Sequence, residues 1–186
     1  DRLESSSIVD IRDKDAVTAE IDRVKPDIVF HLAAQALVRR SYADPIETFA
    51  TNVLGTTNVL EACRLQDSVT AVVCVTTDKV YENYEWAWPY RENDRLGGKG
   101  PYSASKACAE IVASVYQGAL NRADNPVRIA TARGGNVVGG GDWSADRIVP
   151  DIVRALASGA PIVLRNPGAV RPWQHVLELC EGYLEL

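Results

Sequence analysis

The sequence predicts an α/β fold built on a doubly wound parallel sheet. Short apolar runs typical of strands alternate along the chain with longer segments whose apolar residues recur at helical spacing. The segments between consecutive strand candidates are long enough to hold a helix, which is the arrangement of βαβ units with parallel strands. With 186 residues, of which 46% are hydrophobic and 24% charged, the chain is long enough to bury a core.

The predicted elements follow in chain order. Residues 7–10 are strand-like, and residues 15–25 have helical periodicity with Asp13 or Asp15 as N-cap. Residues 27–31 form a continuous apolar run, typical of a strand buried on both faces. The remaining predictions are a helix over 45–65 capped by Asp44, a strand over 69–75, a helix over 101–120, a strand over 127–132, a helix over 148–156, a strand over 162–164 and a helical pattern from 176 to 186.

Composition argues against several classes of function. Lys and Arg total 20 and Asp and Glu total 25, so the net charge of −5 disfavours binding to nucleic acids or anionic membranes through bulk charge. No apolar run approaches the roughly 20 residues of a membrane span, and the first residues lack a signal-peptide pattern. Four widely spaced cysteines without a CxxC pair predict buried free thiols in a reducing cytoplasm: Cys63, Cys74, Cys108 and Cys180.

Both ends of the sequence predict an internal piece of a longer protein. Methionine is absent, position 1 included, and the strand-like residues 7–10 have no earlier strand to pair with. The last helical pattern reaches Leu186 without a cap.

Polar residues follow three of the predicted strands, at 31–35, 76–79 and 133–136. Ligands of parallel sheets bind beyond the carboxyl ends of the strands, so these segments are the candidate site. The connection 77–99 has little periodicity, and long connections of this kind are more often functional than structural. Its two tryptophans, Trp86 and Trp88, need cover from solvent.

Tyr102 and Lys106 lie four residues apart where a predicted helix begins, directly after a glycine-rich turn at 97–100. On one helix face their Cβ atoms are about 5–6 Å apart. A neighbouring cation favours the phenolate, which predicts Tyr102 as a general base. The spacing alone also fits an ordinary structural pair; the preceding strand, which ends in Thr76, Thr77 and Asp78, favours catalysis.

This strand end, followed by Tyr-x-x-x-Lys, resembles the extended short-chain dehydrogenase/reductase superfamily. Five further strings are similar to those of its CDP-glucose 4,6-dehydratase branch: His-Leu-Ala-Ala-Gln at 31–35, Thr-Asn-Val-Leu-Gly-Thr at 51–56, Thr-Asp-Lys-Val-Tyr at 77–81, Gly-Asn-Val-Val-Gly-Gly-Gly-Asp-Trp at 135–143 and Arg-Pro-Trp-Gln-His at 171–175. The resemblance covers nearly the whole chain. It implies a Rossmann-like fold, with a partial NAD-binding domain over 1–140, part of a smaller substrate-binding domain over 141–175, and the start of a further helix over 176–186.

The resemblance implies a bound NAD that is reduced and reoxidised in one turnover, and CDP-glucose as the substrate. Tyr102 would take the proton of the sugar 4-hydroxyl while hydride leaves C4 for NAD and later returns to C6. Lys106 would hold the ribose hydroxyls, Thr77 the 4-oxygen, and Asp78 would be the acid for the departing 6-hydroxyl. Lys79 stands where the related dTDP-glucose enzymes place a glutamate as the C5 base: either burial depresses its pKa so that it can act as a base, or its role differs.

Two further sets of residues match family positions. The NAD set is Asp10, Ile11, Leu32, Ala33, Ala34, Gln35, Asn52, Thr76, Tyr102 and Lys106. The nucleotide-sugar set is Gln35, Thr77, Asn136, Arg147, Arg165 and Arg171. Each has a plainer alternative: Asp10 as a turn element, the alanines as small residues in a tight turn, each arginine as a solvated side chain. Three guanidiniums in one cleft would suit a diphosphate.

His31 is expected to be structural, and His175 is expected to lie at a domain crossing without a catalytic role. No histidine–carboxylate spacing predicts a metal site. None of the 13 glycines supplies the glycine-rich turn that seats a dinucleotide pyrophosphate. We therefore expect the first strands to precede residue 1, and the 186-residue chain alone to be inactive.

Three functions stay open. The favoured one is a cytoplasmic sugar-nucleotide 4,6-dehydratase that forms a homodimer or higher homo-oligomer. The alternatives are a related epimerase or decarboxylase of the superfamily, or a non-catalytic fragment. Residues 77–79 favour dehydration, because a simple epimerase needs no acid for a 6-hydroxyl. The superfamily usually dimerises through the helices expected at 45–65 and 101–120.

Overall fold

The computed structural model describes residues 3–186, and the chain divides into two compact units on either side of the bond between Arg133 and Gly134. The elements of the first unit are α1 (Lys14–Val24), β1 (Ile28–His31), α2 (Val38–Ala43), α3 (Pro45–Phe49), the π-helical turn η1 (Ala50–Leu54), α4 (Gly55–Leu65), β2 (Ala71–Thr77), the 3₁₀ turn η2 (Asp78–Val80), α5 (Pro101–Gln117) and β3 (Arg128–Gly134). Those of the second unit are β4 (Asn136–Val138), α6 (Ile148–Ser158), β5 (Trp173–His175) and α7 (Val176–Glu185).

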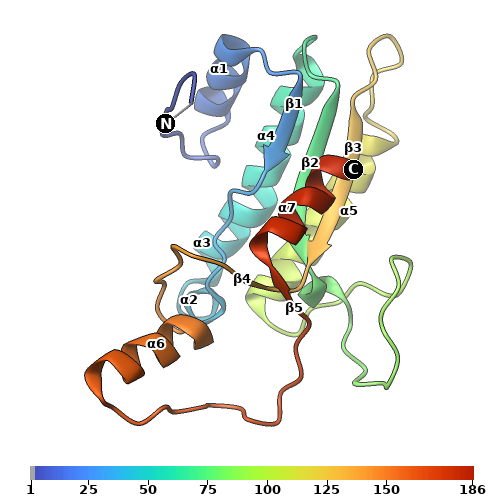
Figure 1. Ribbon diagram of the computed structural model, residues 1–186. Helices are drawn as coiled ribbons and strands as arrows, with labels where there is room; N and C mark the ends of the chain where they lie inside the picture. Colours follow the sequence, from blue (N-terminus) through green and yellow to red (C-terminus); the bar gives the residue numbers. More distant parts are fainter. Residues whose placement is uncertain (1–2) are drawn as a thin grey trace. The chain divides into compact units, whose positions relative to one another are not determined.

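A three-stranded sheet organises the first unit, with β2 between β1 and β3 (Figure 1). β1 and β2 are parallel, with Ile28 opposite Ala71 and His31 opposite Cys74. The β3 arrow points the same way, and α4 and α5 lie behind the sheet in this view (Figure 1). The predicted α/β fold with a parallel sheet is confirmed. All three strands end at the same edge, so the polar residues at the ends of β1 and β2 are brought together.

The core lies between this sheet and α1, α4 and α5. Its central side chains are Leu60 of α4, Val72 of β2, and Val69 and Val127 just before β2 and β3, none more than 1% exposed. The apolar run over 69–75 was the clearest strand signal in the sequence, and burial of this segment is what fixes β2 in the middle of the sheet.

The prediction that the strand over 27–31 is buried on both faces is wrong. His31 is buried, but Ile28 and Phe30 are 53% and 38% exposed. β1 is an edge strand, and within the residues described here only the face toward α4 is covered. Alternate residues of a strand point to opposite faces, so this apolar run leaves half of its side chains open.

The predicted helix over 45–65 forms, but not as one regular helix. Asp44 caps it as predicted, its Oδ1 accepting from the Glu47 N–H at 2.9 Å. The π-helical turn η1 separates α3 from α4. Such widened turns are rare and frequent at functional sites. Here it carries Asn52, which is 1% exposed, into the polar interior.

Two predicted strands do not form. Residues 7–10 and 162–164 have no regular structure, and Ile8 and Val163 are exposed. A strand needs a neighbour to pair its backbone groups, and neither segment has one among the described residues. Their apolar composition was therefore misleading.

The predicted buried thiols are confirmed for two cysteines and wrong for two. All four are free; Cys63 and Cys74 are buried, Cys108 is half-buried and Cys180 is exposed. Burial raises the pKa of both Cys63 and Cys74 to about 12, so these thiols are inert. Cys180 lies on α7, and the local pattern there did not predict which face of the helix is covered.

The second unit contains a short parallel pair, β4 and β5, which was not predicted. Gly135 and Gly139 allow close approach of these segments: an added Cβ would lie 2.9 Å from the Pro172 carbonyl oxygen and 2.6 Å from Val176 Cγ1, respectively. His175 caps α7 in a capping box with Glu178, so its structural role is observed.

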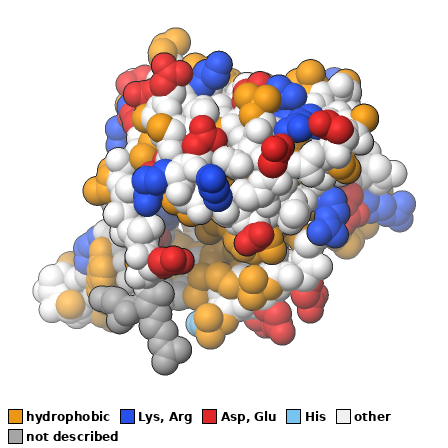
Figure 2. All heavy atoms as spheres, turned by 90° about the horizontal axis from the view of Figure 1, so that it is seen from above, with side chains coloured by type: hydrophobic (Ala, Val, Ile, Leu, Met, Phe, Trp, Pro, Cys, Tyr) orange, Lys and Arg blue, Asp and Glu red, His pale blue; other side chains and the backbone are white. Residues whose placement is uncertain are grey.

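Acidic and basic side chains are interspersed on the face that Figure 2 shows. In the part of the chain that the structure describes, no helix combines the length and apolar character needed to cross a membrane.

Candidate active site

Tyr102 and Lys106 lie one turn apart at the start of α5. Pro101 opens the helix at a position where its missing N–H costs nothing. The Tyr102 N–H donates to Ser41 Oγ at 3.2 Å, which ties this first turn to α2. Lys106 is 5% exposed, and its ammonium donates to the Val75 carbonyl oxygen at 2.9 Å. The predicted pair is therefore held on the helix face that packs against β2.

Burial lowers the pKa of Lys106 to about 8, with Cys74 and Glu110 partly opposing the shift. Since this pKa still lies above 7, most Lys106 side chains carry a charge at neutral pH. A charged ammonium on this face favours the phenolate form of a neighbouring tyrosine. The role of Tyr102 as a general base stays a prediction.

Thr76 and Thr77 are the last residues of β2 and Asp78 follows them, and alternate side chains take different directions. The Thr76 hydroxyl donates to Glu110 and to the Ala132 carbonyl oxygen. The Thr77 hydroxyl donates to Asp78 Oδ1 at 3.0 Å, and both threonines are buried. Thr77 and Asp78 therefore form one polar unit, whereas Thr76 anchors the strand to α5.

Lys79 lies in the 3₁₀ turn η2, whose start is fixed by Thr77: the Lys79 N–H donates to Thr77 Oγ1 at 3.4 Å. Its side chain is half-buried.

Gln35 and Asn52 connect the loop after β1 with α5. The Gln35 N–H donates to Asn52 Oδ1 at 2.8 Å, and Asn52 Nδ2 donates to Ser105 Oγ at 2.9 Å. The Gln35 amide is itself used inside the protein, donating to Thr48 Oγ1 at 2.9 Å. Every one of these groups is buried, so the network fixes the loop after β1.

His31 closes this region from β1. Its Nε2 lies 3.0 Å from Thr56 Oγ1, and that hydroxyl donates to the Asn52 carbonyl oxygen. Burial, with a smaller contribution from Lys106, lowers the pKa of His31 to about 4. The imidazole is neutral near pH 7 and donates to Thr56, which is the structural role predicted for it.

The residues after the carboxyl end of β1 are exposed to solvent, at the tight turn where the small alanines were expected to allow close approach of a dinucleotide. Leu32 and Ala33 are exposed and Ala34 is half-buried. Farther along this edge, Asp10 forms a two-pronged ion pair with Arg12, with Nε to Oδ1 at 2.9 Å, and this contact holds the pKa of Asp10 near 2. Asn58 holds the Ile11 carbonyl oxygen at 2.9 Å.

The remaining predicted residues belong to the second unit. Asn136 begins β4, and its N–H donates to the Pro172 carbonyl oxygen at 2.9 Å. Its Oδ1 is buried and has no hydrogen-bond partner among the described residues. The three arginines pair separately: Arg147 with Asp142 at 3.8 Å, Arg165 with Asp146 and Asp151, and Arg171 with the Val170 carbonyl oxygen at 2.7 Å.

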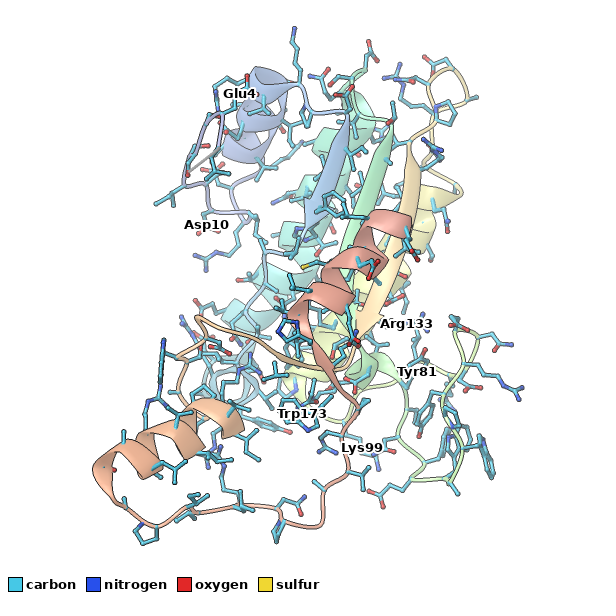
Figure 3. All side chains as sticks on the ribbon, viewed as in Figure 1. Glu4, Asp10, Tyr81, Lys99, Arg133 and Trp173 are labelled. Carbon is cyan, nitrogen blue, oxygen red and sulfur yellow. The ribbon has the colours of Figure 1, made fainter. Side chains whose placement is uncertain are left out.

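A pair of charged residues lies at the sheet edge: Glu110 was not predicted as part of the site, and Arg133 lay in the candidate segment 133–136 without an assigned role. Glu110 is 5% exposed, and both its oxygens accept from Arg133, at 3.0 and 2.9 Å. Arg133 also contacts Tyr81, beside the end of β3 (Figure 3). A signal was present in the sequence: Glu110 follows Tyr102 and Lys106 at intervals of four, which places a carboxylate on the same helix face.

The connection 77–99 carries a series of stacked aromatic rings, but the cover expected for its tryptophans is only partial: Trp86 is half-buried and Trp88 is 60% exposed. Tyr81 stacks on Tyr90 with ring centroids 5.0 Å apart, and Trp86 lies 4.9 Å from Tyr90 and 5.2 Å from Trp88.

Among residues 3–186, no cluster of three His, Cys, Asp or Glu side chains could hold a metal ion.

The sequence matches known proteins along nearly its whole length. A CDP-glucose 4,6-dehydratase of Salmonella typhimurium is 50% identical over 98% of this chain and 52% of its own length. A crystal structure of Thermus thermophilus UDP-glucose 4-epimerase with NAD matches with a TM-score of 0.82 and 31% identity over 95% of this chain and 58% of that one. A dTDP-glucose 4,6-dehydratase double mutant of Streptomyces venezuelae with NAD bound matches with a TM-score of 0.81 and 29% identity over 94% and 52%.

The chain spans about half the length of the curated relatives it matches. The profile of the NAD dependent epimerase/dehydratase family matches residues 3–186. The resemblance inferred from the sequence motifs is therefore confirmed, and the chain belongs to the NAD-dependent epimerase/dehydratase family.

Proposed function

We propose that this chain is the central part of a sugar-nucleotide 4,6-dehydratase that converts CDP-glucose to CDP-4-keto-6-deoxyglucose and water. The observation that carries the proposal is the contact between Thr77 and Asp78 at the end of β2, beside the α5 face of Tyr102 and Lys106. The relative of 50% identity supports the cytidine nucleotide.

The first step is removal of the 4-hydroxyl proton. Tyr102 accepts this proton, and the charged Lys106 keeps its phenolate accessible near neutral pH. Thr77 Oγ1 turns from Asp78 to the sugar 4-oxygen and orients it. NAD, when bound, accepts the hydride that the sugar gives up at C4 and returns it at C6.

The second step is loss of water. The new 4-keto group acidifies the C5 proton, so that the C6–oxygen bond can break once the 6-oxygen receives a proton. Asp78, released from Thr77, delivers that proton. Lys79 lies one residue further along η2, and both of its roles remain predictions. In the first, its neutral amine accepts the C5 proton and returns it to C5 when the hydride reaches C6. In the second, it only contacts the sugar, and solvent water exchanges the C5 proton.

The cofactor fits the described residues. Leu32, Ala33 and Ala34 leave the backbone after β1 open, as close approach of a dinucleotide requires. One of the three ammonium protons of Lys106 goes to Val75, and the ammonium also suits ribose hydroxyls. The NAD set proposed from the resemblance is Asp10, Ile11, Leu32, Ala33, Ala34, Gln35, Asn52, Thr76, Tyr102 and Lys106.

For the nucleotide sugar we propose Gln35, Thr77, Asn136, Arg147, Arg165 and Arg171. Asn136 supplies a specific observation, because its buried Oδ1 lacks a protein donor and can accept from a ligand. The arginines exchange exposed carboxylate partners for a diphosphate.

A homodimer or higher homo-oligomer is part of the proposal. Apolar side chains stand out from α3, η1 and α5: Ile46 and Ile111 are 79% and 56% exposed, and Leu54 is 52% exposed. Sedimentation of the full-length protein tests the assembly.

Four free cysteines support a reducing cytoplasm as the compartment.

The function is tested by incubating the full-length protein with NAD and CDP-glucose and following the products by proton NMR. A dehydratase produces a C6 methyl doublet. An inverted C4 centre with an intact 6-hydroxyl identifies an epimerase, the family alternative represented by the Thermus protein. No change in the sugar leaves the non-catalytic alternative.

A further inference from the structure

Glu110 is a buried carboxylate that the proposed chemistry does not use. Its side chain is 4% exposed. It forms an ion pair at 2.9 Å with Arg133, whose side chain is 17% exposed. A buried charge is tolerated only when its hydrogen-bonding capacity is filled. Glu110 meets this condition with four donors from three strand residues: Thr76, Thr131 and two nitrogens of Arg133.

These contacts, together with two further ones of Arg133, join four segments at the catalytic edge: β2, β3, α5 and the 77–99 connection. Thr76 belongs to β2, Thr131 and Arg133 to β3, and Glu110 to α5. Arg133 Nη1 extends the network into the 77–99 connection, donating to the Tyr81 hydroxyl at 3.0 Å and the Glu92 carbonyl oxygen at 2.8 Å. Its guanidinium also lies 4.9 Å from the centre of the Tyr81 ring (Figure 3).

Glu110 also faces Lys106 across one helical turn. The other titratable groups that face Lys106 are His31 from β1, Cys74 from β2 and Tyr102 from α5 itself. With pKa values of about 4 and about 12, His31 and Cys74 are both neutral near pH 7. Burial opposes ionisation of Glu110, but hydrogen bonds from Arg133, Thr76 and Thr131 outweigh it and lower its pKa. Glu110 is therefore the negative charge behind Lys106.

We propose that Glu110, clamped by Arg133, is a positioning residue for the Tyr102–Lys106 pair. It holds their helix face against the ends of β2 and β3 and keeps the ammonium of Lys106 charged. This inference rests on the proposed function, because it assigns the pair a role in sugar oxidation.

The test compares Glu110→Gln with the wild type in the full-length protein. Glutamine keeps the size of the side chain but not the charge. We expect kcat with CDP-glucose to fall about ten- to hundredfold, as for a small misplacement of catalytic groups, with KM changed less than about twofold. Loss of the negative charge lowers the pKa of Lys106 further, so the fall in rate at high pH begins at lower pH than in the wild type.

The matched control is Glu61→Gln, which breaks the Glu61–Arg64 ion pair on α4, 2.7 Å long and also partly buried. It is expected to leave kcat and the pH profile unchanged. If Glu110→Gln melts at lower temperature but its folded fraction keeps the wild-type kcat and pH profile, the residue is merely structural and the proposal is wrong.

Arg133→Lys is the second variant, for use if Glu110→Gln does not fold. It keeps the positive charge and removes the two-pronged contact, and a kcat equal to the wild type would overturn the proposal. If the wild type does not oxidise CDP-glucose, the proposed function fails, but the inference about Glu110 can still be tested. The second readout is an NMR titration of ¹³C-labelled lysine side chains. The Lys106 signal is assigned as the one that is lost in Lys106→Arg. A lower pKa of Lys106 in Glu110→Gln or in Arg133→Lys supports the proposal, and an unchanged pKa contradicts it.

Discussion

The candidate catalytic groups of the first unit and the candidate substrate arginines of the second are held in opposite ways. Lys106 and Thr77 are both 5% exposed and hydrogen-bond to protein groups. Arg147 and Arg165 have side chains 42% and 47% exposed and pair with exposed carboxylates. The groups that would perform chemistry are preorganised, whereas those that would meet the substrate have partners that are easily exchanged. Changes in the first set should alter rates, and changes in the second should alter KM.

The largest effect is expected from Tyr102→Phe, which removes the hydroxyl and keeps the ring. Without the general base, turnover of CDP-glucose by the full-length protein should fall about 10²–10⁴-fold while binding is retained. Steady-state kinetics and calorimetry with CDP-glucose measure the two effects. Tyr116→Phe, on the same helix, is the matched control; a Tyr102→Phe variant with more than a tenth of the wild-type rate would remove Tyr102 from the mechanism.

Asp78→Asn should separate the two half-reactions. Oxidation at C4 uses Tyr102 and Thr77 and continues, whereas loss of water slows by about 10²-fold because the amide is a poor proton donor. NADH absorbance should therefore accumulate in a single turnover. Equal slowing of NADH formation and of water loss would contradict this division of roles.

Gly98→Ala is expected to disturb the start of α5. The added Cβ would lie 2.5 Å from the backbone nitrogen of Ala104, which cannot move without shifting the helix. We expect a loss of about 1–3 kcal/mol in the free energy of unfolding, together with slower turnover. Urea denaturation measures the first. Gly140→Ala, with nothing within 4 Å of its added Cβ, should be neutral; equal stability of both variants would show that the turn tolerates a side chain.

The smallest effect is expected in the second unit. Arg165→Gln breaks exposed ion pairs to Asp146 and Asp151, so its stability should change by only about 0–1 kcal/mol. If Arg165 contacts the diphosphate, KM for CDP-glucose rises about tenfold at unchanged kcat, the loss of one charge-assisted hydrogen bond. A change in kcat instead would place Arg165 with the preorganised groups.

Local patterns were sufficient to predict much of the fold. Helical spacing and caps identified α1, α5 and α6, and Asp13 caps α1 through the Ala16 N–H at 3.1 Å. The π-helical turn was not predictable, because its reason is tertiary: Asn52 reaches Gln35 and Ser105 from a widened turn. β4 and β5 were missed for the same reason, since each is three residues long and forms only by pairing with the other.

The candidate site was predictable where it depends on spacing along one element. Tyr102 and Lys106 could be identified as a pair because helix geometry fixes their relation. The clamp of Glu110 by Arg133 joins residues 23 positions apart on a helix and a strand. Nothing in the local sequence at Arg133 shows that its partner is a buried carboxylate rather than solvent, so only the structure reveals this contact.

The central claim is that the sugar is oxidised at C4 and reduced at C6 within one site. It is tested most directly with CDP-glucose carrying deuterium at C4, incubated with the full-length protein and NAD. The account predicts that NMR and mass spectrometry of the product find the deuterium in the C6 methyl group. Deuterium that returns to C4, with the 6-hydroxyl intact, would contradict dehydration and identify an epimerase.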